Sequence, residues 1–138
     1  MNQPPIRDFQ DLQVYQKAYA VSLEMHNATL KFPRHEQFEL SSQIRRASKG
    51  ICANIAEGFG KQNISKAEFK RFLLIAMGLA DEMRVWVRYC LDLGYIEQER
   101  WRHWNDEYQN IARMLNGLHS KVELMVCLSV LSLLYSVL

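Results

Sequence analysis

The chain has 138 residues, which is enough for one ordinary domain and too few for two. Hydrophobic residues make up 49% and charged residues 23%, a mixture that excludes wholesale disorder. The 17 Lys and Arg residues against 15 Asp and Glu give a net charge of +2, so any nucleic-acid-binding surface has to come from local clustering.

The first helix is expected over residues 11–32. Asp8 or Asp11 can cap its start, and Pro33 ends it because the residue before a proline disfavours the α conformation. The residues of its buried face recur at steps of three and four, the period of an amphipathic helix: Tyr15, Ala18, Ser22, Met25, Thr29 and Phe32.

The second helix is expected to begin between residues 36 and 39 and to end near Gly58 and Gly60. Small residues lie on or near its buried stripe, so a neighbouring helix can come close. That stripe comprises Leu40, Ile44, Ala47, Ile51, Ile55 and Gly58.

The third helix is expected over residues 66–93, and its start carries two local signals. Ser65 and Glu68 have the spacing of a capping box, and Ile64 and Phe69 have that of a hydrophobic staple. Gly94 follows as a C-terminal cap, with the next residue able to fold back on the last turn.

The fourth helix is expected from about residue 97 onward, because apolar residues repeat there in an unbroken heptad series. The series comprises Trp101, Trp104, Tyr108, Ile111, Leu115, Leu118, Val122 and Met125. Four helices joined by short turns predict an all-α, antiparallel up-down-up-down four-helix bundle over residues 11–122. An N-terminal tail over residues 1–10 precedes the bundle, and an extension over residues 123–138 follows it.

The extension is apolar and carries no charge from residue 124 to residue 138. As a helix this run would be about 22 Å long, shorter than the ~30 Å hydrocarbon core, so no stable transmembrane span is expected. Three interpretations stay open: packing in an oligomer, shallow membrane contact, or an altered reading frame.

Catalysis and metal binding have no motif in this sequence. It has no Gly-rich phosphate loop, no GxSxG elbow and no Glu-x-x-His pair of the kind that holds metals in helical bundles. The cysteines at positions 52, 90 and 127 form no CxxC pair, which predicts reduced thiols in a cytoplasmic protein. We therefore expect no catalytic residues, no metal and no cofactor.

Three groups of residues are candidates for function. The basic clusters could bind nucleic-acid phosphates, and they comprise Arg45, Arg46, Lys49, Lys61, Lys66, Lys70 and Arg71. Three polar residues lie beside the buried stripe of the second helix: Gln43, Asn54 and Glu57. They could form an inter-helix network with nearby arginines and with Glu82 of the third helix, or part of a ligand site. Trp86 and Tyr89 lie partly off the buried stripe of the third helix and are candidates for a subunit interface.

Several motifs in the first three helices resemble the 23S rRNA intervening-sequence protein family. They are DLxVYxKA at 11–18, FP at 32–33, QIRRA at 43–47, NIAEG at 54–58, SxxEFxxFLxIAxG at 65–78 and GYI at 94–96. The resemblance covers roughly residues 9 to 120. Two departures are Cys52, where the family usually has proline, and the chain after Val122.

The resemblance implies a bundle that assembles into a homopentamer. It also implies a distant similarity to the accessory variability proteins of diversity-generating retroelements, which are basic pentamers that bind reverse transcriptase and nucleic acid. Some family members are encoded inside insertions in large-subunit ribosomal RNA genes, which suggests a connection with RNA. We therefore expect a non-enzymatic oligomer that binds RNA or DNA through clustered Lys and Arg. The alternative is a scaffold that docks a partner enzyme without binding nucleic acid.

Overall fold

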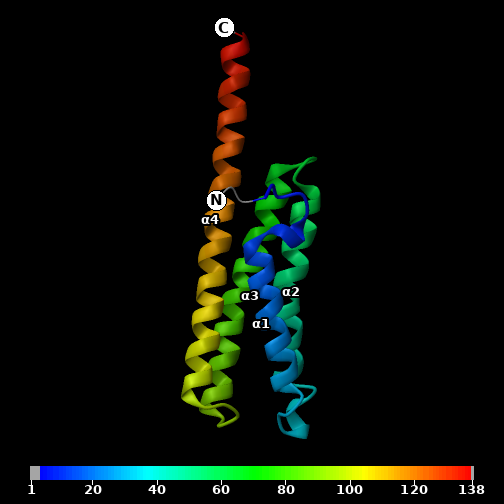
Figure 1. The fold of residues 1–138 in the computed structure, drawn as a ribbon, viewed down its shortest axis with the longest axis vertical. Coiled ribbons are helices and arrows are strands. Elements are labelled where there is room, and N and C mark those ends of the chain that lie inside the picture. The colour runs from blue at the N-terminus through cyan, green and yellow to red at the C-terminus, as the bar shows by residue number, and fades with distance from the viewer. Residues whose placement is uncertain (1–3, 138) are drawn as a thin grey trace.

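The protein is all-helical in the computed structural model, which describes residues 4–137 (Figure 1). Within that range there is no strand, and four α-helices are present, as the sequence predicts. They are α1 (Gln13–Thr29), α2 (Leu40–Lys61), α3 (Lys66–Asp92) and α4 (Gln98–Val137), with short 3-10 helices at Phe9–Asp11 and Arg34–Glu36.

Each α-helix packs against two of the others. α3 has the most extensive contacts, with α2 on one side and α4 on the other, whereas α1 contacts α2 and, over a smaller area, α4. Across the narrow seam between α1 and α4, Lys17 Nζ lies 3.1 Å from Glu107 Oε2 and the indole N–H of Trp104 donates to Glu24 Oε2 at 2.9 Å. The four helices therefore enclose one hydrophobic core.

The core follows the predicted stripes closely. Its largest fully buried side chains include Trp104, Tyr108, Met25, Ile44 and Ile51. Burying such side chains stabilises the fold by roughly 1.5–3 kcal/mol each relative to exposure, before the loss of conformational entropy is counted. In the heptad series of α4, Trp104, Tyr108, Ile111, Leu115 and Val122 are buried, whereas Trp101 and Leu118 are half-buried.

The first helix is shorter than predicted, because its predicted caps belong to the preceding 3-10 turn. The Asp8 carboxylate accepts from the backbone N–H of Phe9 at 2.8 Å, and Asp11 Oδ2 accepts from the backbone N–H of Asp8 at 2.9 Å. α1 then begins at Gln13 and ends at Thr29, three residues before the end predicted from Pro33.

The start of α3 has the predicted Ser65 cap, but the capping box is incomplete and the hydrophobic staple is absent. The Ser65 hydroxyl accepts from the backbone N–H of Glu68 at 3.2 Å, but the Glu68 side chain turns to Arg71 instead of completing the box. The predicted staple is wrong, because the Ile64 side chain is 90% exposed and does not reach Phe69.

The end of α3 is a Schellman cap. Gly94 has φ +78°, and the backbone N–H groups of Gly94 and Tyr95 donate to the carbonyls of Leu91 and Cys90. The Tyr95 ring packs 5.2 Å from that of Phe32, as expected of a residue that folds back.

α4 continues past the other helices as a single rod (Figure 1). Val122 is its last buried residue, and Met125, which the heptad series places in the core, is 57% exposed. The helix is long and apolar enough to cross a membrane by length and composition, and nearly all of the apolar stretch is exposed.

Candidate functional surfaces

The seven basic candidates do not form one site, because the fold places them in four different surroundings. Arg45 has a structural role where α1 joins α2. Its guanidinium donates to Thr29 Oγ1 at 3.1 Å, to Gln37 Oε1 at 3.3 Å and to the Gln37 carbonyl at 2.9 Å. It is half-buried and therefore not free to bind phosphate.

Arg46 and Lys49 lie one turn apart on the exposed face of α2. Arg46 approaches Gln43 Oε1 at 3.5 Å, and Lys49 Nζ lies 3.1 Å from His26 Nδ1. The two partners are an amide and an imidazole, and neither cation pairs with a carboxylate of residues 4–137. Their positive charge is consequently available to a ligand.

Lys61 and Arg71 flank the ring of Phe72, where α2 meets α3. Their cationic groups lie 4.8 Å and 4.5 Å from the ring centroid. Each also pairs with a carboxylate, Lys61 with Glu57 at 3.5 Å and Arg71 with Glu68 at 3.0 Å. The Arg71 guanidinium lowers the pKa of the Glu68 carboxyl through their hydrogen bonds. Two cations and two carboxylates make this cluster neutral.

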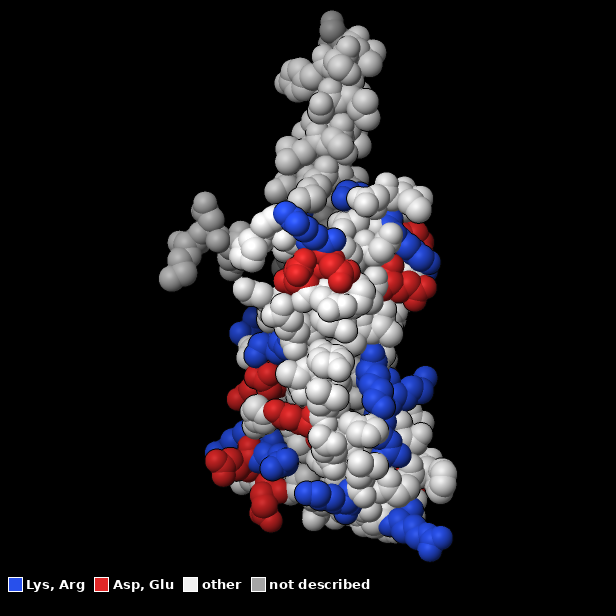
Figure 2. Space-filling view, turned by 45° about the vertical axis from the view of Figure 1, so that its right-hand side comes forward, with Lys and Arg blue, Asp and Glu red and all other residues white. Residues whose placement is uncertain are grey.

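Lys66 and Lys70 lie on the flank of α3 that faces α4. Lys70 Nζ is 3.5 Å from Glu123 Oε1, which places both lysines beside the point where α4 leaves the bundle. Over the face of the molecule in Figure 2, basic and acidic side chains are interspersed rather than gathered in one patch.

The four polar candidates do not form an inter-helix network. Asn54 donates to the Gly50 carbonyl at 2.7 Å, Glu57 pairs with Lys61, and Glu82 Oε1 accepts from the indole N–H of Trp86 at 3.0 Å. Each of these bonds joins residues of one helix, as does that between Arg46 and Gln43. The reason is that i,i+3 and i,i+4 neighbours satisfy these side chains before a second helix is reached.

Trp86 and Tyr89 lie together on α3, with ring centroids 6.0 Å apart. Trp86 is half-buried and Tyr89 is 52% exposed. Both border a shallow hollow between α2 and α3, to which Gln43, Leu40 and Leu93 also contribute.

Tyr89 belongs to a larger apolar surface, which we call the α3 outer face. Its residues span an arc of about 100° on the side of α3 away from the core. It comprises Leu74, Ile75, Gly78, Val85 and Tyr89, all of which are exposed. Sequence reasoning found only Tyr89 of these five, although their spacing off the core stripe would have identified the rest.

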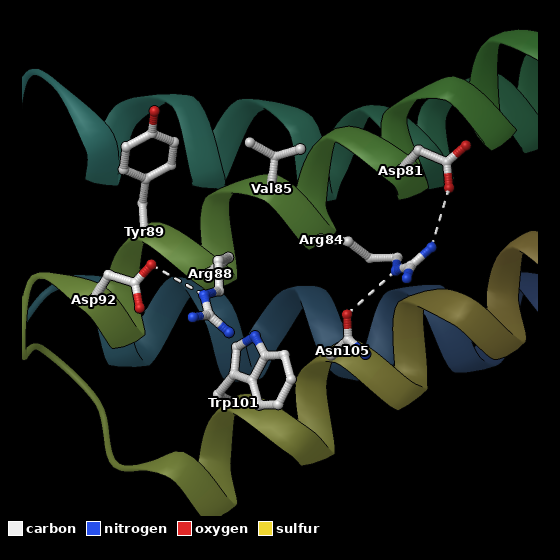
Figure 3. A pocket seen from close by; sticks show the side chains of 8 residues that line it. All are labelled: Asp81, Arg84, Val85, Arg88, Tyr89, Asp92, Trp101 and Asn105. Carbon is white, nitrogen blue, oxygen red and sulfur yellow. Dashed lines mark hydrogen bonds and ion pairs between the residues drawn. The ribbon is translucent and has the colours of Figure 1, made fainter.

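A groove between α3 and α4 adjoins this face (Figure 3). The Nε of Arg84 donates to Asn105 Oδ1 at 3.2 Å, and the Nε of Arg88 donates to Asp92 Oδ2 at 3.0 Å while its guanidinium lies over the Trp101 ring. Asp81 and Asp92 balance the two arginines, so the groove has no excess charge to hold an anion.

Among the described residues, no three His, Cys, Asp or Glu side chains lie close enough together to hold a metal ion. Burial raises the pKa of the Cys52 thiol to about 11 and that of Cys90 to about 12, so these two cysteines are poor nucleophiles.

The fold and these surfaces define a small four-helix protein with an exposed apolar face and dispersed cations. The chain belongs to the 23S rRNA-intervening sequence protein family, whose profile matches residues 10–117. A comparison with curated proteins gives no match. Among solved structures, the chain is similar to a protein of unknown function from the S23 ribosomal protein family of Bacteroides thetaiotaomicron, with 27% identity and a TM-score of 0.70. That similarity covers 78% of this chain and 95% of the other, and α4 after residue 117 lies beyond the family match.

Proposed function

We propose that the protein is a non-enzymatic, cytoplasmic homo-oligomer that binds nucleic-acid backbones. The observation that carries the proposal is the pair Arg46 and Lys49, whose charges are adjacent, exposed and unpaired among residues 4–137. Lys61 and Arg71 form a second, separate cluster near the end of α2, and their exposed carboxylate partners can be displaced by phosphate because surface ion pairs are weak.

Assembly multiplies a surface of this kind. Two cations make few phosphate contacts alone, but a homopentamer would present five copies, and linked contacts bind far more tightly than single ones. The α3 outer face supports such assembly, since contiguous exposed apolar side chains are common at protein interfaces. We infer further that the four helices run antiparallel in up-down-up-down order, which the short connections between consecutive helices support.

Fluorescence anisotropy with a labelled mixed-sequence RNA and a DNA duplex tests the nucleic-acid proposal. We expect binding at low salt that weakens steeply with ionic strength, because bound cations release counterions from the backbone. Arg46→Glu combined with Lys49→Glu should weaken it by at least about tenfold. The matched control is Arg102→Glu with Arg113→Glu on α4, which makes no contact with α2 and undergoes the same change in net charge. An equal loss in both double variants, or no binding at low salt, would refute the proposal.

The α3 outer face favours a second candidate, a scaffold that docks a partner protein. Its exposed apolar side chains and the neutral groove of Figure 3 suit a protein surface better than a polyanion. Light scattering separates the two uses of the face. A mass of several 16.2 kDa chains that falls to one chain in Val85→Arg shows self-assembly, whereas a monomeric wild-type protein leaves the face to another partner.

A further inference from the structure

We propose that the projecting end of α4 inserts into an anionic lipid bilayer, with the lysines around its base at the headgroups. The juxtaposition that points to this is an uncharged, largely exposed helix whose base lies beside three lysines, Lys66, Lys70 and Lys121. The proposal goes beyond nucleic-acid binding, because it uses neither Arg46 nor Lys49.

The exposed end of α4 is apolar on all sides except for one stripe of serines. From Leu128 onward its large apolar side chains are between 50% and 85% exposed, and they include the near-consecutive positions Leu128, Val130, Leu131, Leu133, Leu134 and Tyr135. Successive helical residues are turned by about 100°, so these positions cover most of the rod, and Ser129, Ser132 and Ser136 line the remaining stripe. A helix of this kind is suited to an apolar medium that surrounds it.

A second copy of the same segment would cover it incompletely. A paired helix buries one stripe, at the a and d positions, and leaves the other faces in water. In an amphipathic coiled coil those other faces are charged, whereas here residues 124–137 contain no charge at all. The lipid bilayer is the occupant that contacts all faces at once.

Two of the three serines in the segment bond within their own helix. The Ser129 hydroxyl donates to the Val126 carbonyl and the Ser136 hydroxyl to the Leu133 carbonyl, both at 2.8 Å. Hydroxyls bonded in this way within their own helix present no unsatisfied donor to the hydrocarbon.

The charge at the base of the segment matches an anionic surface. Lys66 and Lys70 on α3 lie beside α4 at this point, and Lys121 is exposed one turn before the uncharged run begins. Among the described residues, Glu123 pairs with Lys70 and Asp11 lines the same hollow as Lys121, so the three lysines outnumber the two acids beside them. Anionic headgroups attract lysines that lie next to an apolar helix in this way.

The uncharged residues that the structure describes, 124–137, extend about 21 Å as a helix. This depth carries the segment past one leaflet of a hydrocarbon core about 30 Å thick. When the segment inserts to this depth, Lys66, Lys70 and Lys121 lie at the headgroups and the bundle remains in water.

Vesicle flotation with the full chain tests this inference. We use vesicles of phosphatidylcholine alone and of equal parts phosphatidylcholine and phosphatidylserine. The wild-type protein should float with both and more completely with the anionic vesicles. Leu128→Asp with Leu131→Asp should reduce the floated fraction about tenfold, because charged side chains are costly in hydrocarbon. Lys66→Glu with Lys121→Glu should abolish the preference for anionic vesicles while the apolar contribution remains.

Matched controls separate insertion from general stickiness. Leu23→Asp with Leu30→Asp makes the same change at a leucine of α1 and at the residue that follows this helix, which are 49% and 58% exposed, and this variant should float like the wild type. Far-ultraviolet circular dichroism and urea unfolding must show that all variants remain folded. Flotation that survives the α4 aspartates, or that the α1 aspartates abolish equally, would overturn the proposal.

A fluorescent label at Cys127 gives a second readout. Cys127 is exposed on the segment, whereas Cys52 and Cys90 are buried, so an environment-sensitive thiol probe attaches selectively. Insertion predicts a blue shift of its emission on addition of anionic vesicles. A blue shift that appears without lipid and grows with protein concentration, together with no flotation, would assign the segment to contacts between copies instead.

Discussion

Arg45 and Arg46 are neighbours in the sequence, but the helical turn of α2 places them in different surroundings. Arg45 binds Thr29 and Gln37 with three hydrogen bonds, and Arg46 remains exposed on the outer face. A charged donor that satisfies buried or half-buried oxygens contributes more to stability than a solvated one. The two arginines therefore differ in what their loss would change.

Replacing Arg45 with alanine should lower the free energy of unfolding by about 2 kcal/mol, because the connection between α1 and α2 loses its charged hydrogen bonds. Arg46→Ala should change it by less than about 0.5 kcal/mol, as is usual for an exposed side chain. Urea titrations followed by circular dichroism measure both. Equal effects of the two substitutions would contradict the structural role of Arg45.

The three cysteines differ in accessibility and acidity. Cys127 is exposed, whereas burial raises the pKa of Cys52 to about 11 and of Cys90 to about 12. At pH 8 we expect iodoacetamide to alkylate one thiol rapidly in the native protein and all three in guanidinium. Mass spectrometry of the peptides identifies the sites, and rapid modification of Cys90 under native conditions would be inconsistent with the packed core.

At the scale of elements, two glycines show opposite packing demands. An added Cβ at Gly58 would lie 2.7 Å from Phe72 Cβ and 3.1 Å from the Phe69 ring, so α2 and α3 approach closely there. An added Cβ at Gly78 meets nothing within 4 Å. Glycine inside a helix costs stability relative to alanine, and the bundle itself gives no reason for this residue on the α3 outer face.

Gly58→Ala should destabilise the protein by about 1–3 kcal/mol through overpacking against Phe72. Gly78→Ala should stabilise the monomer by up to about 1 kcal/mol through helix propensity. If another copy approaches α3 closely at Gly78, the same alanine should lower the mass measured by light scattering. Thermal unfolding in dilute solution measures the first two effects, and a stabilising Gly58→Ala would show that α2 and α3 are not in close contact.

At the scale of the whole molecule, α4 consists of a buried part and a projecting part. The core ends at Val122, and the next residue, Glu123, forms an ion pair with Lys70 of α3. The buried part of α4 therefore stabilises the fold, and the projecting part is the segment proposed to contact a membrane.

Ending the chain after Glu123 should leave the free energy of unfolding unchanged to within about 0.5 kcal/mol, because exposed side chains contribute little to stability. The same truncation should remove flotation with vesicles and keep nucleic-acid binding at α2. Urea unfolding of the truncated and full chains, compared in the same buffer, checks the first point. A large loss of stability would show that the projecting part packs against the bundle.

The sequence alone determined the four helices, their buried stripes and the end of α3 at Gly94. These features follow from local periodicity and capping, in which the interacting residues are a few positions apart. The family motifs identified the fold for the same reason, since most of them mark core and turn positions. The half-formed box at Ser65 and the exposed Ile64 show the limit of this reasoning, because tertiary packing leaves that turn in water.

Only the tertiary structure decided which side chains are free. It assigned Arg45 to Thr29 and Gln37, and it left the polar candidates of α2 and α3 bonded within their own helices. It placed Lys66 and Lys70 beside α4, and it showed that the apolar end of that helix has no partner in the bundle. The physical reason is that the availability of a charge or an apolar face depends on which distant residues lie against it.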